Sequence, residues 1–147
     1  MLINNKHYRT IWEKDKFGDI EIIDQTLLPH KFETITIKSL NQTADIIKNM
    51  NVRGAPLIGA AGAYGMCLAL RDNTSDKSIN DAYKILLNTR PTAVNLRWAL
   101  DKIKKEILIT STTKRLETAY KIARKICEND IKICEKIGNH GLEIIKN

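Results

Sequence analysis

The run from Leu57 to Leu70 contains no charged residue, which is the strongest constraint that this sequence places on its fold. A chain in water buries a stretch of this length and composition. Gly54, just before the run, permits a turn that is closed to residues with side chains, and Pro56 fits the first turn of a helix. The stretch therefore predicts a tight turn followed by a buried helix that ends near Arg71.

The start of this predicted helix is a candidate anion site. The first N–H groups of a helix have no intrahelical acceptor, and the helix dipole places about half a positive charge there. Arg53 directly precedes the turn, and its guanidinium group matches phosphate or carboxylate oxygens. Together these groups predict a cradle for an anion.

Two other interpretations of this stretch need no ligand. Gly59, Gly62, Ala63 and Met66 share one helical face, and such a smooth face suits close packing in a core. A membrane span is the second alternative, but the uncharged run is short beside the roughly 20 apolar residues that a bilayer requires. The pattern alone leaves the anion cradle and the tightly packed core helix open.

A second arginine lies outside a second predicted helix. Pro91 biases Arg90 toward an extended backbone, and Thr92 is expected to cap the helix that follows. If the two helix starts converge, Arg53 and Arg90 together suit a doubly charged phosphate. The sequence does not establish that convergence. Trp98, in the second helix, is expected to be a core or interface side chain.

The composition argues against several classes of function. The chain has 147 residues and a net charge of +7, yet its basic residues alternate with acidic ones and lack interleaved aromatic residues. We therefore expect no nucleic-acid partner and no membrane partner. The first residues carry no secretory signal, and the three cysteines form no Cys-x-x-Cys pair, so a cytoplasmic protein with reduced thiols is expected. The three histidines lack metal-ligand spacing, so no metal is expected.

The order of the predicted elements gives an α+β fold of one domain. Short alternating segments at 7–13, 19–25 and 32–38 predict an antiparallel three-stranded meander over residues 1–38. A helical bundle is predicted over 39–147, with a capping box at Ser39 and a cap at Ser78. Gly138 and Gly141 are expected to loosen the last helix.

Acid–base chemistry is poorly supplied near the predicted cradle. No carboxylate lies between Val52 and Leu70, and Tyr64 and Cys67 are expected to be buried. Asp24 is expected to orient a loop or cap a turn.

Four stretches of the chain resemble the methylthioribose-1-phosphate isomerase family. They occur in the family's order, and the regulatory subunits of translation initiation factor 2B share this superfamily. The matching stretches are Ile23-Asp24-Gln25-Thr26-Leu27-Leu28-Pro29, Met50 to Gly59, Arg90 to Leu100, and Ile137-Gly138-Asn139-His140-Gly141.

The resemblance implies an aldose–ketose isomerase that converts 5-methylthioribose 1-phosphate to 5-methylthioribulose 1-phosphate in methionine salvage. It implies a homodimer with no metal and no organic cofactor. It also implies that Arg53, Gly54, Ala55 and Arg90 contact the sugar phosphate. The resemblance thereby favours the anion cradle over ligand-free packing.

Family members are longer and continue into a Rossmann-like domain that carries the catalytic cysteine and aspartate. None of Cys67, Cys127 and Cys134 lies in the matching motif, so we assign no catalytic residue in this chain. The expectation is a truncated chain that is inactive alone and needs a C-terminal domain encoded separately. The alternatives are a non-catalytic binding or assembly module, as in the translation-factor relatives, and a remnant without a selected role.

Overall fold

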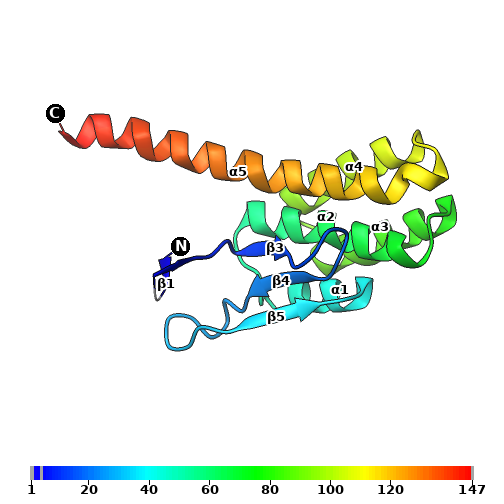
Figure 1. Ribbon diagram of the computed structural model, residues 1–147, viewed down its shortest axis with the longest axis horizontal. Helices are drawn as coiled ribbons and strands as arrows, with labels where there is room; N and C mark the ends of the chain where they lie inside the picture. Colours follow the sequence, from blue (N-terminus) through cyan, green and yellow to red (C-terminus); the bar gives the residue numbers. More distant parts are fainter. Residues whose placement is uncertain (1, 4, 147) are drawn as a thin grey trace.

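The fold is built around one buried helix, as the uncharged run predicts. The computed structural model describes residues 2–3 and 5–146, and α2 (Ala55–Asp72) lies at the centre of its helical layer (Figure 1). Every residue of α2 from Ile58 to Leu70 is buried, because α1, α3, α4 and α5 all pack against it. The surrounding helices are α1 (Leu40–Lys48), α3 (Asp76–Thr89), α4 (Val94–Leu108), the 3-10 turn η1 (Thr112–Lys114) and α5 (Arg115–Lys146).

An antiparallel sheet precedes the helices, which confirms the α+β class. Its strands are β3 (Ile11–Glu13), β4 (Ile20–Ile23) and β5 (Thr34–Ile37), in the order β3-β4-β5. Ile22 of β4 is paired with Ile11 on one side and Ile35 on the other. The meander is therefore as predicted, although each strand is shorter than its predicted segment.

The prediction of a strand over 7–13 is wrong in its first part. His7 belongs to a separate hairpin of β1 (Leu2–Ile3) and β2 (Lys6–His7), which the sequence pattern did not indicate. Asn5 in this hairpin has a φ of 61°, in the left-handed region where asparagine is common in turns.

Glu13 and Arg124 join the sheet to the helical layer. The guanidinium group of Arg124 on α5 donates to both carboxylate oxygens of Glu13 on β3, over 2.8 and 3.0 Å. The Cζ atom of Arg124 lies 5.4 Å from the ring centre of Phe17 and 5.9 Å from that of Tyr120. The Tyr120 hydroxyl in turn donates to the carbonyl of Gly18 over 2.9 Å. A bidentate ion pair between aromatic rings thus fixes the sheet against α5.

The predicted helix caps are partly right. Ser39 caps α1 by accepting from the Gln42 amide, as expected, but the Gln42 side chain accepts from Lys38 rather than from Ser39. Ser75, and not Ser78, caps α3, because the Ser75 hydroxyl accepts from the Ser78 amide.

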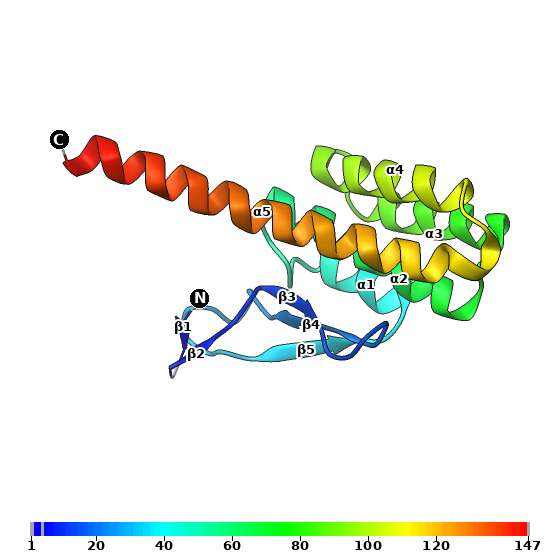
Figure 2. The same ribbon diagram turned by 45° about the horizontal axis from the view of Figure 1, so that its top comes forward.

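The last helix continues through its two glycines, and the prediction that they loosen it stays untested. α5 runs 32 residues through Gly138 and Gly141, so these residues do not end it. Its first half is buried against α2 and α4, whereas its second half projects beyond the other helices (Figure 2). No helix within residues 2–3 and 5–146 is long and apolar enough to cross a membrane.

Candidate anion-binding site

The helices α2 and α4 begin side by side, so the two helix starts converge. A Cβ atom added at Gly59 would lie 2.8 Å from the carbonyl oxygen of Asn95, in the first turn of α4. One added at Gly62 would lie 2.4 Å from a methyl carbon of Leu96. Both helices start at the end from which α5 projects (Figures 1 and 2). The glycine face therefore serves close packing and also brings two positive helix ends together.

The turn before α2 leaves its first amides available. Gly54 has a φ of 90°, which side chains disfavour, and its carbonyl accepts from the Ile58 amide over 3.0 Å. Among residues 2–3 and 5–146, no side chain caps this end. Because Ala55 and Pro56 occupy the first two helical positions, the Ala55 amide has no intrahelical acceptor and Pro56 has no N–H. Gly54 and Ala55 are both exposed, as a contact with a ligand requires.

Arg53 lies on a loop that the Asp24-Gln25-Thr26 segment supports. The Gln25 amide side chain accepts from the Arg53 backbone N–H over 2.8 Å, and the Gln25 backbone N–H donates to Asn51 over 2.9 Å. The Arg53 Nε donates to the Met50 carbonyl over 3.4 Å, and its side chain is exposed. These contacts hold the backbone of Arg53 while its guanidinium group stays at the surface.

Asp24 orders the supporting segment, as predicted. One of its oxygens accepts from the Thr26 amide over 2.9 Å and from the Thr26 hydroxyl over 2.6 Å. Burial raises its pKa, but the hydrogen bonds from Thr26 and Asn51 and the nearby Arg53 charge outweigh that effect and lower the pKa below its usual value. Asp24 is therefore ionised at neutral pH, which suits a structural role and not that of a general acid.

Arg90 precedes α4 in a different way from Arg53. It is the residue at which α3 ends, with φ −147° and ψ 80°, and its carbonyl accepts from the Ala93 amide over 3.0 Å. This turn makes Ala93 the N-cap of α4, so the prediction that Thr92 caps the helix is wrong. The Arg90 side chain is half-buried. It makes no hydrogen bond or ion pair with the residues that the structure describes, and only the Arg90 backbone carbonyl is bonded.

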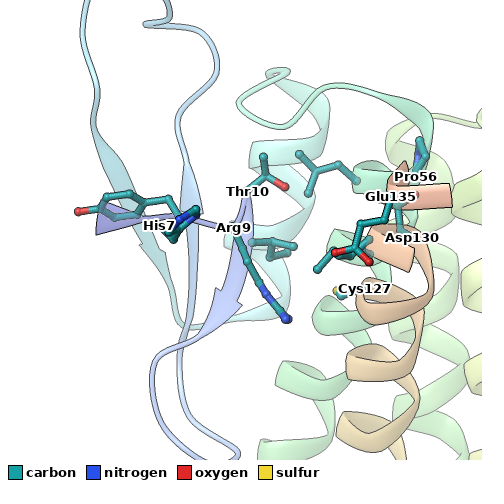
Figure 3. A pocket seen from close by; sticks show the side chains of 12 residues that line it. His7, Arg9, Thr10, Pro56, Cys127, Asp130 and Glu135 are labelled. Carbon is teal, nitrogen blue, oxygen red and sulfur yellow. The ribbon is translucent and has the colours of Figure 1, made fainter. Parts of the chain in front are cut away.

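Two cavities flank the first turn of α2, and Pro56 and Asp130 line both. The first has a volume of about 570 Å³ and lies between residues 7–11, α2 and α5. Arg9 extends into it from the strand side, and Asp130 and Glu135 reach it from α5 (Figure 3). The second has a volume of about 460 Å³ and lies between α2, α4 and α5. Sequence reasoning missed both, because their walls come from segments that are far apart in the chain.

Of the two roles expected for Trp98, core or interface side chain, the structure excludes the core and leaves the interface a prediction. Trp98 is 51% exposed in the wall of the second cavity, and the Lys102 ammonium lies 4.9 Å from its ring centre. The buried side of α4 carries Leu96, Ala99 and Leu100, and Trp98 lies outside this side of the helix.

None of the three cysteines has the surroundings of a catalytic nucleophile. Burial raises the pKa of Cys67 well above its usual value and raises that of Cys127 to about 11. Cys134 is exposed on the projecting part of α5. Within residues 2–3 and 5–146, no group of three or more His, Cys, Asp or Glu side chains is arranged to hold a metal ion.

Thiol labelling checks this assignment. At pH 8 we expect a disulfide reagent to modify one thiol of the folded chain rapidly, that of Cys134, because only this cysteine is exposed. Cys67 and Cys127 should react in urea, after unfolding removes the burial that keeps them protonated. Cys134→Ser is the control, since it should abolish the fast phase. A second fast thiol in the folded chain would contradict the structure.

Comparison with known proteins places the chain in a family. The model of the initiation factor 2 subunit family matches residues 51–147, which is most of the chain. The chain belongs to this family. The resemblance stated from its motifs is confirmed, because a relative named methylthioribose-1-phosphate isomerase, from Escherichia coli O45:K1, is 44% identical over 99% of the chain.

Two relatives show how much of a longer or similar-sized protein the chain matches. An uncharacterised protein encoded in the petC 3′ region of Rhodospirillum rubrum is 45% identical and covers 95% of the chain and 76% of its own length. The chain spans 39% of the length of the Escherichia coli isomerase.

Solved structures share the fold. The translation initiation factor eIF-2B subunit delta from A. fulgidus superposes with a TM-score of 0.77 and 37% identity, over 85% of this chain and 38% of that one. The 5-methylthioribose 1-phosphate isomerase from Pyrococcus horikoshii gives a TM-score of 0.70 and 38% identity, over 82% and 37%.

Proposed function

We propose that this chain carries the phosphate-binding part of an aldose–ketose isomerase site for 5-methylthioribose 1-phosphate. One observation carries the proposal: the starts of α2 and α4 lie side by side, and an arginine precedes each. The exposed Ala55 amide, the two helix dipoles and the guanidinium groups of Arg53 and Arg90 all favour a dianion. The identity of the proposed ligand, a sugar phosphate, is taken from the names of the isomerase relatives.

The proposal assigns binding and not catalysis to these residues. A cradle that holds phosphate binds the ground state and the transition state alike and therefore contributes little to the rate. Isomerisation needs an acid and a base beside the reacting carbons, and Asp24, Cys67 and Cys127 are unsuited to that role. We therefore propose that turnover requires groups from a C-terminal catalytic domain, and that the chain alone is inactive.

The remaining parts of the proposal concern the cell. We place the protein in the cytoplasm, in methionine salvage, as a homo-oligomer without a nucleic-acid or membrane partner. The free cysteines support the cytoplasmic placement, and the name of the isomerase relatives, methylthioribose-1-phosphate isomerase, supports the metabolic one.

Titration with 5-methylthioribose 1-phosphate and with inorganic phosphate tests the proposal. We expect both to bind, and Arg53→Ala or Arg90→Ala to weaken each about 10- to 100-fold, because each charge-assisted contact contributes about 1.5–3 kcal/mol. Lys105→Ala removes one positive charge at the opposite end of α4 and serves as the control. Equal losses in all three variants would indicate a diffuse charge effect and would falsify the site.

A second candidate function is a non-catalytic assembly module. The higher TM-score with the translation-factor subunit and the apolar residues exposed on the projecting half of α5 favour it. These residues are Ile133, Ile137, Leu142, Ile144 and Ile145. Capture of a specific protein partner by a chain that has no affinity for sugar phosphates would support this function over the first.

A further inference from the structure

The second cavity, between α2, α4 and α5, is an apolar groove. Its apolar wall consists of Pro56, Val94, Trp98, Ile126 and Ile133. Val94 is 76% exposed, Trp98 51% and Ile133 55%, although apolar side chains of this size are usually buried. Three such side chains facing one groove form a surface that gains free energy when an apolar group covers it.

The groove adjoins the proposed phosphate site. Pro56 is in the first turn of α2 and Val94 is the first residue of α4, so the same two turns contribute to both. At about 460 Å³ the groove is within the size range of small-molecule sites. A ligand whose phosphate lies at the helix starts can therefore extend into the groove.

The chemistry of the groove selects the uncharged end of such a ligand. Its polar lining consists of Asn95, Asn129 and Asp130, and the Asp130 carboxylate disfavours a second anion. Lys102 lies over the Trp98 ring, so this cation is engaged there. A thioether suits the remaining surface, because its sulfur makes favourable contacts with aromatic rings.

We propose that this groove binds the methylthio end of the sugar phosphate and that Trp98 and Val94 determine specificity for it. The inference rests on the proposed function and adds to it the basis on which a 5-methylthio sugar is preferred over a 5-hydroxy sugar. The phosphate provides affinity at the helix starts, whereas the groove distinguishes one pentose 1-phosphate from another.

Calorimetric titration of the full chain with two sugars tests the specificity. We expect 5-methylthioribose 1-phosphate to bind about tenfold more tightly than ribose 1-phosphate, as burial of one small apolar group predicts. In Trp98→Ala and in Val94→Ala the preference should fall below threefold. Both side chains are at least half exposed, so these variants should fold, and thermal melting checks that they do.

Ile109→Ala is the matched control. Ile109 is 80% exposed and lies at the opposite end of α4, so its removal should leave the preference at about tenfold. If both sugars bind the unmodified chain equally, the groove proposal is overturned while the proposed function stands. If neither sugar phosphate binds, both are overturned. Concentration-dependent dimerisation that Trp98→Ala abolishes, together with equal affinity for the two sugars, would show that a second copy covers the groove instead.

Discussion

Gly59→Ala is expected to lower the free energy of unfolding by about 2 kcal/mol, against the usual benefit of alanine in a helix. The new Cβ would lie 2.8 Å from the Asn95 carbonyl oxygen, which is a backbone atom and cannot rotate away. A contact this close with a backbone atom belongs at the upper end of the overpacking cost of about 1–3 kcal/mol, and the gain in helix propensity returns only about 1 kcal/mol, which leaves a net loss of about 2 kcal/mol. For a domain of this size we expect the melting temperature to fall by about 6 °C.

The same substitution should also weaken phosphate binding. The start of α4 has to move away from α2 to admit the methyl group, and this movement separates the two proposed anion-binding ends. Isothermal titration with inorganic phosphate, below the melting transition, measures the effect. A destabilised variant with unchanged phosphate affinity would show that the distance between the helix starts is unimportant for binding.

Gly138→Ala supplies the control for Gly59→Ala. Gly138 is also within a helix, but an added Cβ meets no atom within 4 Å. Here only the propensity term acts, so alanine should stabilise α5 by up to about 1 kcal/mol. Opposite signs for two identical substitutions would establish that contact with α4, and not helix propensity, decides the effect at Gly59.

Arg115→Met is expected to lower the free energy of unfolding by about 3 kcal/mol, which is about 10 °C in melting temperature. The Arg115 side chain is 7% exposed and forms an ion pair with Asp76 at 2.6 Å. Its three nitrogens also donate to the carbonyls of Thr110, Thr74 and Leu108, over 3.2, 2.7 and 3.4 Å. Methionine fills a similar volume, but it leaves these carbonyls and the Asp76 carboxylate without their donor.

Two further variants separate the contributions at Arg115. Arg115→Lys keeps the charge but loses the planar fork, so its melting temperature should lie between those of the native chain and Arg115→Met. Arg97→Met removes an exposed arginine and should change stability by no more than about 0.5 kcal/mol. If Arg97→Met were as unstable as Arg115→Met, loss of net charge and not the buried contacts would explain both.

The buried helix was predictable because its sequence allows few alternatives. The 18 residues of α2 include an uncharged run that is stable in water only when it is buried in a core. The glycines on one face of α2 indicated that another element packs closely against it. The neighbour itself was not predictable, since no local pattern states that Gly59 meets Asn95. The adjacency of the α2 and α4 starts depends on this contact, so the two arginines could be read from the sequence, but the packing of the helices that follow them could not.

The errors have local causes. Thr92 was expected to cap α4, but the hydrogen bond from Ala93 to Arg90 closes a turn first and moves the cap by one residue. Trp98 was expected in the core or at an interface, and the core alternative failed because its face of α4 borders an open groove. Gly54 was identified from turn chemistry and Ala55 from the family resemblance, and their role in binding stays a prediction.

The parallel orientation of α2 and α4 has an electrostatic consequence for the fold. Two helix dipoles that point the same way at close contact repel each other, and here two arginines add positive charge at the same end. A dianion at the proposed site would act as a shared counterion for this end and relieve the repulsion. Because a ligand that binds only the native state stabilises it by mass action, the proposed site would couple folding of the helical layer to the concentration of phosphate compounds around it.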